Sequence, residues 1–212
     1  MDHGERRDED GDLGDPHGPR GAAATGLPPG QRPVDELRPT HYGRVPTIDF
    51  ASWSLTVSGA TADGLDHTLL WADLEAMAQV EVVADHHCVS RRSVADVRWG
   101  GVPGAALLAA VPPAREARYV LAYGTYGYHS NITVDDLRAD GALLATHLDG
   151  APLPPEHGWP LRLVLPHLYG WKGPKWLVAL EYHVRPRRGF WEQRGYHFTG
   201  GVWREERYAH QE

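Results

Sequence analysis

The sequence predicts an α+β protein with a single folded domain. Short helical segments alternate irregularly with runs of β-branched and aromatic residues, which is typical of a mixed sheet and not of a regular βαβ winding. The chain has 212 residues, and 42% of them are hydrophobic, which is enough to build one core. No internal repeat or second linker divides the body. We therefore expect one domain over residues 39–212.

Residues 1–38 are predicted to form a disordered, acidic tail. They are rich in Gly, Pro and Asp, and no hydrophobic periodicity begins before Tyr42, so this segment cannot bury enough apolar surface to order itself. Residues 1–20 hold most of the net charge of −7. The nearly neutral body offers no basic footprint for nucleic acid, so we expect no nucleic-acid partner.

The sequence also favours a cytoplasmic protein without a membrane span. A single cysteine excludes an intramolecular disulfide. No stretch reaches the roughly 18 apolar residues that cross a bilayer. Arg6-Arg7 resembles the start of a twin-arginine export signal, but three acidic residues follow it instead of an apolar segment.

Two strands and two helices are predicted in the first half of the body. Residues 52–57 alternate as in a half-buried strand, and residues 70–77 have the pattern of a short helix. The β-branched run at 80–83 forms a strand that delivers the chain to Cys88. A helix is expected over 102–110, where two prolines then stop it. Cys88 is thus expected just past a strand end, where functional sites are commonly built.

The second half is predicted to contain three strands and one helix. Residues 119–123 form a strand candidate, and Thr133 with Asp136 makes the capping-box pattern of a helix beginning next to the threonine. Strands over 161–165 and 176–180 are joined by a loop rich in Gly and Pro.

Cys88 is the first candidate for chemistry. It lies close in sequence to His86, His87, Arg91 and Arg92, and neighbouring positive charge stabilises a thiolate, which is a nucleophile or a soft metal ligand. A buried structural cysteine is the alternative.

Two other chemistries use the same cysteine. A zinc site is disfavoured because adjacent histidines point to opposite faces of a strand and the usual ligand spacing is absent. A cysteine hydrolase needs a histidine beside the sulfur, and His129, His147 and His157 are all available in the sequence. The sequence leaves the hydrolase open.

A basic segment follows at residues 153–176. It places His157, Arg162, Lys172 and Lys175 around two turns rich in Gly and Pro. Exposed backbone N–H groups and fixed positive charge suit a phosphate-bearing ligand, whereas a solvated hairpin rim is the alternative.

Five segments of the sequence form a recognisable set. They are HYG at 41–43, DHHCVSRRSVADVRWGGV at 85–102, YGYHSN at 126–131, HGWPLRLVLPHLYGWKGPKWL at 157–177 and GFWEQRGYH at 189–197. Together they resemble the sulfite oxidase family of molybdopterin-binding oxidoreductases, because they occur in that family's order and cover most of the chain from residue 42 to 208.

The resemblance implies the mixed-sheet fold of that family and a role for each matching residue. Cys88 falls where members supply a thiolate to the single molybdenum, consistent with the softness of both partners. His157 and Arg162 fall where the pterin and its phosphate are held, and Lys175 where the phosphate is closed in. The resemblance places further cofactor-binding positions at His41, Tyr42, Gly43, Thr125, Ser130, Asn131, Lys172 and Gly173.

The sequence departs from the family's pattern at two points. Arg91 and Arg92 stand three and four residues after the cysteine, where sulfite oxidases have an arginine pair four and five residues after it. Gly173 replaces a serine. We expect Arg91 or Arg92 to attract an anionic substrate and act in catalysis, and the shift puts the identity of that substrate in doubt.

The resulting expectation is a molybdenum cofactor-dependent oxidoreductase that transfers an oxygen atom, with two electrons, to or from a small oxyanion or sulfoxide. The protein supplies binding and electrostatics while the cofactor supplies redox chemistry. No haem-attachment motif occurs in the sequence, so no haem is expected, and electrons should pass to or from an external partner. The alternatives are a molybdopterin-binding protein without turnover and, behind it, a cysteine hydrolase.

Overall fold

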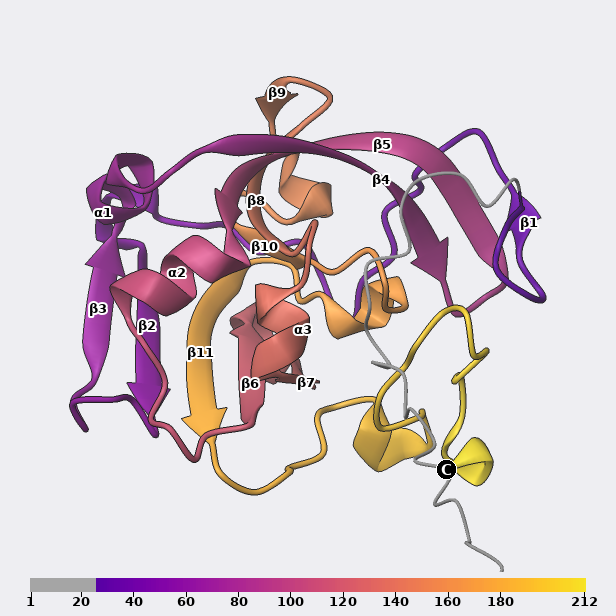
Figure 1. Ribbon diagram of the computed structural model, residues 1–212. Helices are drawn as coiled ribbons and strands as arrows, with labels where there is room; N and C mark the ends of the chain where they lie inside the picture. Colours follow the sequence, from indigo (N-terminus) through magenta and orange to yellow (C-terminus); the bar gives the residue numbers. More distant parts are fainter. Residues whose placement is uncertain (1–25) are drawn as a thin grey trace, which may run out of the picture.

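Two mixed β-sheets and a few short helices make up the described part of the chain, residues 26–212 of this computed structural model (Figure 1). One sheet has the order β3-β2-β11-β6-β7. Its strands are β2 (Ser54–Gly59), β3 (His67–Leu70), β6 (Tyr119–Gly124), β7 (His129–Thr133) and β11 (Leu177–His183). The predicted α+β class is confirmed.

The second sheet carries the hairpin that leads to Cys88. Its main path is β1-β5-β8-β10, with β4 paired to β5 and β9 paired to β8. Its strands are β1 (Arg32–Pro33), β4 (Val80–Cys88), β5 (Arg92–Pro103), β8 (Leu143–Leu148), β9 (Ala151–Pro152) and β10 (Arg162–Val164). The long β4–β5 hairpin arches over the rest of the molecule in Figure 1.

Three short α-helices connect strands within residues 26–212. They are α1 (Trp71–Ala76), α2 (Gly104–Ala110) and α3 (Val134–Arg138). The predicted capping box is confirmed at α3, where Thr133 Oγ accepts from Asp136 N at 2.9 Å and Asp136 Oδ2 accepts from Thr133 N at 2.7 Å. The helix predicted from residue 102 begins two residues later because β5 extends to Pro103.

Cys88 lies inside the β4–β5 hairpin, whereas the sequence predicted that it follows a strand end. The cysteine is the last residue of β4 and pairs with Arg92, the first residue of β5. A tight turn therefore follows Cys88, and the sulfur lies at the tip of a hairpin and not in an open loop.

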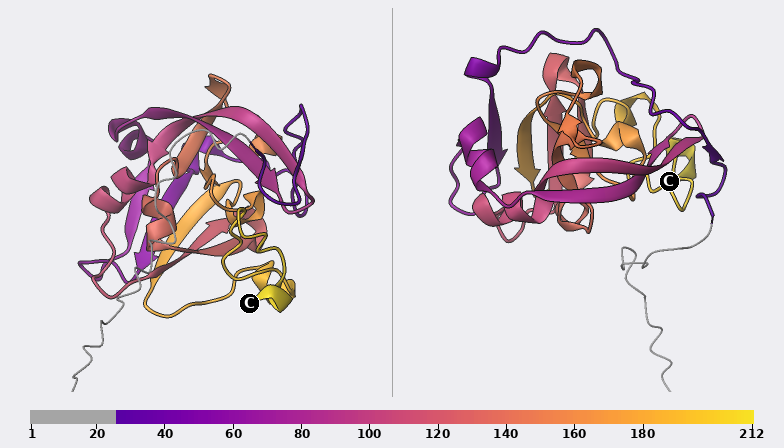
Figure 2. Two further views of the ribbon diagram at one scale, coloured as in Figure 1. Left: turned by 45° about the vertical axis from the view of Figure 1, so that its right-hand side comes forward. Right: turned by 90° about the horizontal axis from the view of Figure 1, so that it is seen from above.

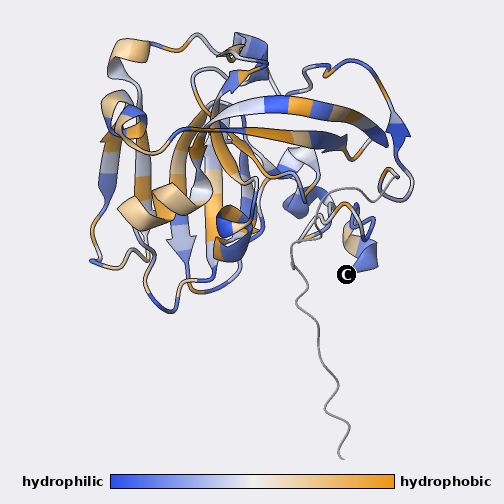
Figure 3. Cartoon of the chain, turned by 45° about the horizontal axis from the view of Figure 1, so that its top comes forward, coloured by the Kyte–Doolittle hydropathy of each residue, from blue (hydrophilic) through white to orange (hydrophobic). Residues whose placement is uncertain are grey.

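Apolar side chains of both sheets form the core. The larger buried cluster includes Leu55, Val120, Leu144, Leu163 and Leu180, all 0% exposed. Figure 3 shows hydrophobic residues alternating with polar ones along the strands, and mainly polar colours in several connecting segments. Burial of about 1.5 to 3 kcal/mol per large aliphatic side chain holds the sheets together.

The predicted tail boundary at residue 38 is wrong for residues 26–38, whereas residues 1–25 lie outside the described residues. β1 pairs in parallel with β5, Arg32 N donates to Arg91 O at 3.0 Å, and Val34 N donates to Ser93 O at 2.9 Å. The segment runs along one side of the molecule from the tip of the hairpin (Figure 2). Pairing with an existing strand edge orders it, although its own sequence has no hydrophobic periodicity.

Among residues 26–212, no helix has the length and apolar character needed to cross a bilayer.

Candidate functional site

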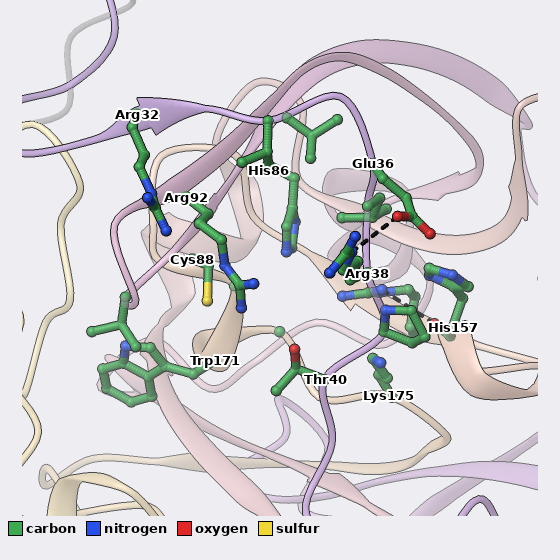
Figure 4. Close-up of a pocket in the computed structure, with 18 of the residues that line it drawn as sticks. Arg32, Glu36, Arg38, Thr40, His86, Cys88, Arg92, His157, Trp171 and Lys175 are labelled. Carbon is green, nitrogen blue, oxygen red and sulfur yellow. Dashed lines mark hydrogen bonds and ion pairs between the residues drawn. The ribbon is translucent and has the colours of Figure 1, made fainter.

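A cavity of about 620 Å³ lies between the tip of the β4–β5 hairpin, the N-terminal segment at residues 32–40 and the basic turns at residues 157–175 (Figure 4). Six residues that the sequence assigned to the site line it. They are Cys88, Arg92, His157, Arg162, Gly173 and Lys175. The fold thus brings together two motifs that are about seventy residues apart in the sequence.

Cys88 is partly exposed and lines this cavity. Ser90 Oγ donates a hydrogen bond to Cys88 Sγ at 3.0 Å, and Arg92 Nε donates to Ser90 Oγ at 3.2 Å. The turn is closed by Arg91 N, which donates to Cys88 O at 3.0 Å while Arg91 adopts a positive φ of 67°. Gln31 Nε2 also donates to Cys88 O at 3.2 Å.

The other side of the cavity carries two cations, the buried Arg162 and the partly buried Lys175. Arg162 is 3% exposed, its guanidinium lies 4.9 Å from the Trp99 ring, and its only side-chain hydrogen bond within the described residues is from NH1 to His157 O at 3.2 Å. Arg162 Nε has no hydrogen-bond partner. Lys175 Nζ donates to Glu156 O at 2.7 Å.

Burial changes the acidity of both cations. It lowers the pKa of Arg162 to about 10. Burial, followed by repulsion from Arg162, lowers the pKa of Lys175 to about 7. Within residues 26–212 neither side chain forms an ion pair with a carboxylate. Buried charge without a counter-charge is costly, so these residues fit the phosphate of a bound cofactor, which would supply both the negative charge and the missing acceptor.

His86 is a pocket residue whose place the sequence did not reveal. Burial, followed by the positive charge of Arg162, lowers the pKa of His86 to about 3. The imidazole is therefore neutral, which contradicts the expectation that it adds positive charge beside the sulfur. A Cβ at Gly170 would lie 2.5 Å from His86 Nε2. The turn at residues 170–172 therefore approaches the His86 ring so closely that only glycine fits at position 170.

His87 faces the other side of β4, as expected for adjacent residues of a strand. Its Nδ1 lies 2.7 Å from Ser93 Oγ in the interior. Among the described residues, no group of three or more His, Cys, Asp or Glu side chains could hold a metal ion. Of the three histidines that a cysteine hydrolase could use, only His157 lines the cavity.

Lys172, Ser130 and Asn131 were expected to bind the cofactor, but their side chains lie in the interior. Lys172 Nζ donates to Asn131 O at 2.8 Å, Asn131 Oδ1 at 3.0 Å and Glu192 Oε1 at 2.8 Å, and it also contacts the carbonyl of Phe198. Ser130 Oγ donates to Lys172 O at 2.6 Å. An ammonium has three hydrogens, so this lysine has no donor left for a phosphate.

We expect Lys172→Met to lower the free energy of unfolding by about 3 kcal/mol. The substitution leaves the Glu192 carboxylate buried without its partner, and removing one member of a buried pair is strongly destabilising. Urea unfolding of the cofactor-free protein measures the change. The double variant Lys172→Met/Glu192→Gln should recover part of the loss, and a loss below about 1 kcal/mol in the single variant would contradict the ion-pair assignment.

His41, Tyr42, Gly43 and Thr125 do not line the cavity. The His41 ring contacts the Trp176 ring at 5.5 Å, and Thr125 Oγ donates to Trp176 O at 3.3 Å. Because Trp176 directly follows Lys175 in sequence, His41 and Thr125 contact the turn that carries this lysine without lining the cavity.

The arginine pair after Cys88 is split by the turn. Arg92 lines the cavity, whereas Arg91 is exposed and does not. Arg32 and Arg38 line it instead, from the N-terminal segment. Arg32 stands opposite Arg92 in the parallel register of β1 and β5. Only this pairing brings the two together, so no local pattern could have revealed Arg32.

Residues 42–191 match the family described as the oxidoreductase molybdopterin-binding domain. The chain belongs to this family. It is therefore an enzyme, a molybdopterin-dependent oxidoreductase, and the predicted family is confirmed. The basic cluster of Arg162 and Lys175 lies inside the matched range, whereas Arg32 and Arg38 precede it.

Two relatives and one solved structure show how far this likeness extends. The oxidoreductase YuiH of Bacillus subtilis is 37% identical over 86% of this chain and 92% of its own length. The putative protein-methionine-sulfoxide reductase subunit YedZ1 of Azospira oryzae is 33% identical over 76% of this chain and 61% of its own length. The sulfane dehydrogenase SoxCD of Paracoccus pantotrophus has a TM-score of 0.63 at 19% identity, over 73% of this chain and 43% of its own, which shows a shared fold.

The lowered pKa of Lys175 predicts pH-dependent anion binding. The lysine must be protonated to bind an anion, so raising the pH from 7 to 8 through its pKa of about 7 should weaken sulfate binding to the cofactor-free protein by about fivefold. Sulfate is suitable because it stays fully ionised over this range. Titration calorimetry measures the affinity, and Lys175→Arg, which keeps its charge, should remove the dependence. Equal pH dependence in both proteins would contradict the assignment to Lys175.

Proposed function

We propose that this oxidoreductase holds one molybdenum atom through Cys88 and catalyses two-electron oxygen-atom transfer on a small oxyanion or an organic sulfoxide. The observation that carries the proposal is one cavity lined by Cys88, by the buried Arg162 with its unpartnered Nε and by the partly buried Lys175, neither of which forms an ion pair within the described residues. The printed name of YedZ1, a putative protein-methionine-sulfoxide reductase subunit, supports the sulfoxide class.

The protein's part in this reaction is binding and charge stabilisation. When bound, the cofactor supplies the two-electron redox change. Arg162, Lys175 and His157 would hold its phosphate, and Cys88 would ligate the metal. Reduction of a sulfoxide consumes two electrons and two protons and releases a thioether and water. Arg92 would donate hydrogen bonds to the substrate oxygen as negative charge develops there.

Arg32 completes this anion subsite in the proposal. Like charges directly opposite on neighbouring strands are destabilising, yet Arg32 stands opposite Arg92, and no described carboxylate forms an ion pair with either one. A negatively charged or strongly polar substrate between them would relieve the repulsion.

We expect Arg32→Ala and Arg92→Ala each to lower kcat/KM for the preferred substrate by roughly 10- to 100-fold, the range that one charge-assisted hydrogen bond of about 1.5 to 3 kcal/mol provides. Steady-state kinetics with a reduced dye as electron donor measures the effect. Arg91→Ala is the matched control and should stay within about twofold, because Arg91 is exposed outside the cavity. A larger effect of Arg91 than of Arg32 would contradict this subsite.

Metal analysis combined with a substrate panel tests the proposed function. The protein is produced in a host that makes the cofactor, its molybdenum content is measured by mass spectrometry, and turnover is assayed with methionine sulfoxide, dimethyl sulfoxide, sulfite and nitrate. Near-stoichiometric molybdenum with turnover of at least one compound supports the proposal. Metal-loaded protein that is inert on all four would favour a cofactor-binding protein without turnover. Ester hydrolysis by metal-free protein, abolished by Cys88 alkylation, would favour a hydrolase.

We further propose that the protein acts in the cytoplasm without haem and exchanges electrons with an external carrier. The single cysteine supports the absence of covalently attached haem, because that attachment needs a cysteine pair, and the lack of any possible intramolecular disulfide is consistent with the cytoplasm. Cell fractionation and an absorption spectrum without haem bands test both statements.

A further inference from the structure

Ser90 lies between two groups of the proposed site. Its hydroxyl is 3.0 Å from Cys88 Sγ and 3.2 Å from Arg92 Nε. The tight turn that follows β4 creates this arrangement, because Arg91 N closes the turn on Cys88 O with Arg91 in the left-handed region.

The direction of both hydrogen bonds follows from the donor inventory. A guanidinium Nε can only donate, so the Ser90 oxygen is the acceptor of the Arg92 contact. A metal-ligating cysteine is a thiolate without a hydrogen, so it can only accept. The single hydrogen of the Ser90 hydroxyl therefore points at the sulfur, and the positive charge of Arg92 polarises that O–H bond.

Other residues hydrogen-bond to the backbone of the turn, whereas the Ser90 side chain hydrogen-bonds to the Cys88 sulfur. Gln31 Nε2 donates to Cys88 O at 3.2 Å, and Arg207 NH1 donates to Val89 O at 2.7 Å. These bonds fix the two consecutive peptide groups through which the chain passes from β4 to Ser90. Among the described residues, Ser90 is the one hydrogen-bond donor recorded at Cys88 Sγ.

We infer that Ser90 is a positioning residue that relays the charge of Arg92 to the Cys88 sulfur and thereby sets the reduction potential of the molybdenum centre. This inference rests on the proposed ligation of molybdenum by Cys88. A hydrogen bond to a ligating thiolate withdraws electron density from it, which favours the reduced metal and raises the potential. Second-shell hydrogen bonds of this kind orient and tune metal ligands generally.

The relay also links the substrate subsite to the metal ligand. Arg92 lines the cavity, and its Nε is engaged by Ser90, so an anion bound at the remaining guanidinium nitrogens offsets part of the charge that reaches the sulfur. Anion binding should therefore lower the potential slightly in the wild-type enzyme, and this response should disappear without the hydroxyl.

The test compares Ser90→Thr with Ser90→Val in the cofactor-loaded enzyme. The two side chains have nearly the same shape and differ in the hydroxyl, and Ser90 is exposed, so the added methyl groups have room. Redox titration followed by electron paramagnetic resonance of Mo(V) reports the potential and the g-values. We expect the valine variant to have a lower potential, shifted g-values and no response to sulfate, whereas the threonine variant behaves as wild type.

Metal content separates this inference from the proposed function. Absence of molybdenum from the wild-type protein would contradict the proposed function. Fully loaded Ser90→Val with wild-type potential and g-values would overturn the relay alone. If the valine variant does not retain molybdenum, Ser90→Ala is titrated in its place. Retention by the threonine variant but by neither apolar variant supports the relay, and loss of metal in all three variants, threonine included, overturns the role assigned to the hydroxyl.

Discussion

Replacing Cys88 with serine is expected to reduce kcat/KM by more than about 100-fold. Loss of an outer-shell partner of a metal ligand typically costs 10- to 100-fold, and loss of the ligand itself should cost more, because a serine hydroxyl is a harder and less acidic donor than a thiol. The fold should be unaffected, since Cys88 lies at the hairpin tip outside both hydrophobic clusters.

Three measurements on Cys88→Ser separate chemistry from folding. Mass spectrometry gives molybdenum content, electron paramagnetic resonance gives the Mo(V) environment, and thermal unfolding of the cofactor-free protein gives stability. We expect altered or lost metal signals with an unchanged melting temperature. Activity within about tenfold of wild type, with an unaltered Mo(V) spectrum, would show that the sulfur does not ligate the metal.

Replacing Arg162 with methionine is expected to have opposite effects on the cofactor-free and cofactor-loaded proteins. The guanidinium is 3% exposed and has an unpartnered Nε, so without an anion it is a buried charge that costs stability. Even buried ion pairs can often be exchanged for apolar residues of similar volume with a neutral effect or a gain of about 1 to 4 kcal/mol, and a charge without a partner carries the same desolvation cost with less compensation. Two charge-assisted hydrogen bonds to a phosphate, at about 1.5 to 3 kcal/mol each, would be lost from the complex.

We therefore expect Arg162→Met to weaken cofactor binding by at least about 100-fold while it raises the unfolding free energy of the cofactor-free protein by about 1 kcal/mol or more. Urea unfolding of metal-free protein measures the second change, and the pterin content after gel filtration reports the first. Arg162→Lys is the control, because lysine keeps the positive charge but cannot form a bidentate hydrogen bond to a phosphate. A cofactor-free methionine variant that is less stable than wild type, or full pterin retention, would contradict this role.

Local sequence patterns predicted the short helices and most inner strands. The capping box of Thr133 and Asp136 and the alternation of residues 52–57 depend on neighbours within a few positions, and both are found in the structure. The twelve-residue strand β5 was missed. The half of β5 next to the turn has an irregular alternation of charged and apolar residues, and its far end contains two adjacent glycines. Hydrogen bonding to β4 and β8 therefore determines this strand more than the β-propensity of its own residues does.

The residues proposed to hold the cofactor were more predictable from the sequence than those proposed to face the substrate. Cys88, Arg162 and Lys175 belong to contiguous motifs, and the structure places all three on the cavity. Lys172 lies in the same motif as Lys175 but points away from the cavity to a buried carboxylate. Residue type and spacing did not distinguish the two lysines, because the carboxylate that binds one of them lies twenty residues further along the chain.

Residue types at short spacing were sufficient to predict the family, the cysteine proposed as metal ligand and the basic residues proposed to neutralise a phosphate. Folding was needed to bring Arg32 opposite Arg92, to place the Ser90 hydroxyl against the Cys88 sulfur and to pair Lys172 with Glu192 in the interior. Strand register and the pairing of buried charges depend on segments up to about sixty residues apart, and their energies arise only when packing brings those segments together.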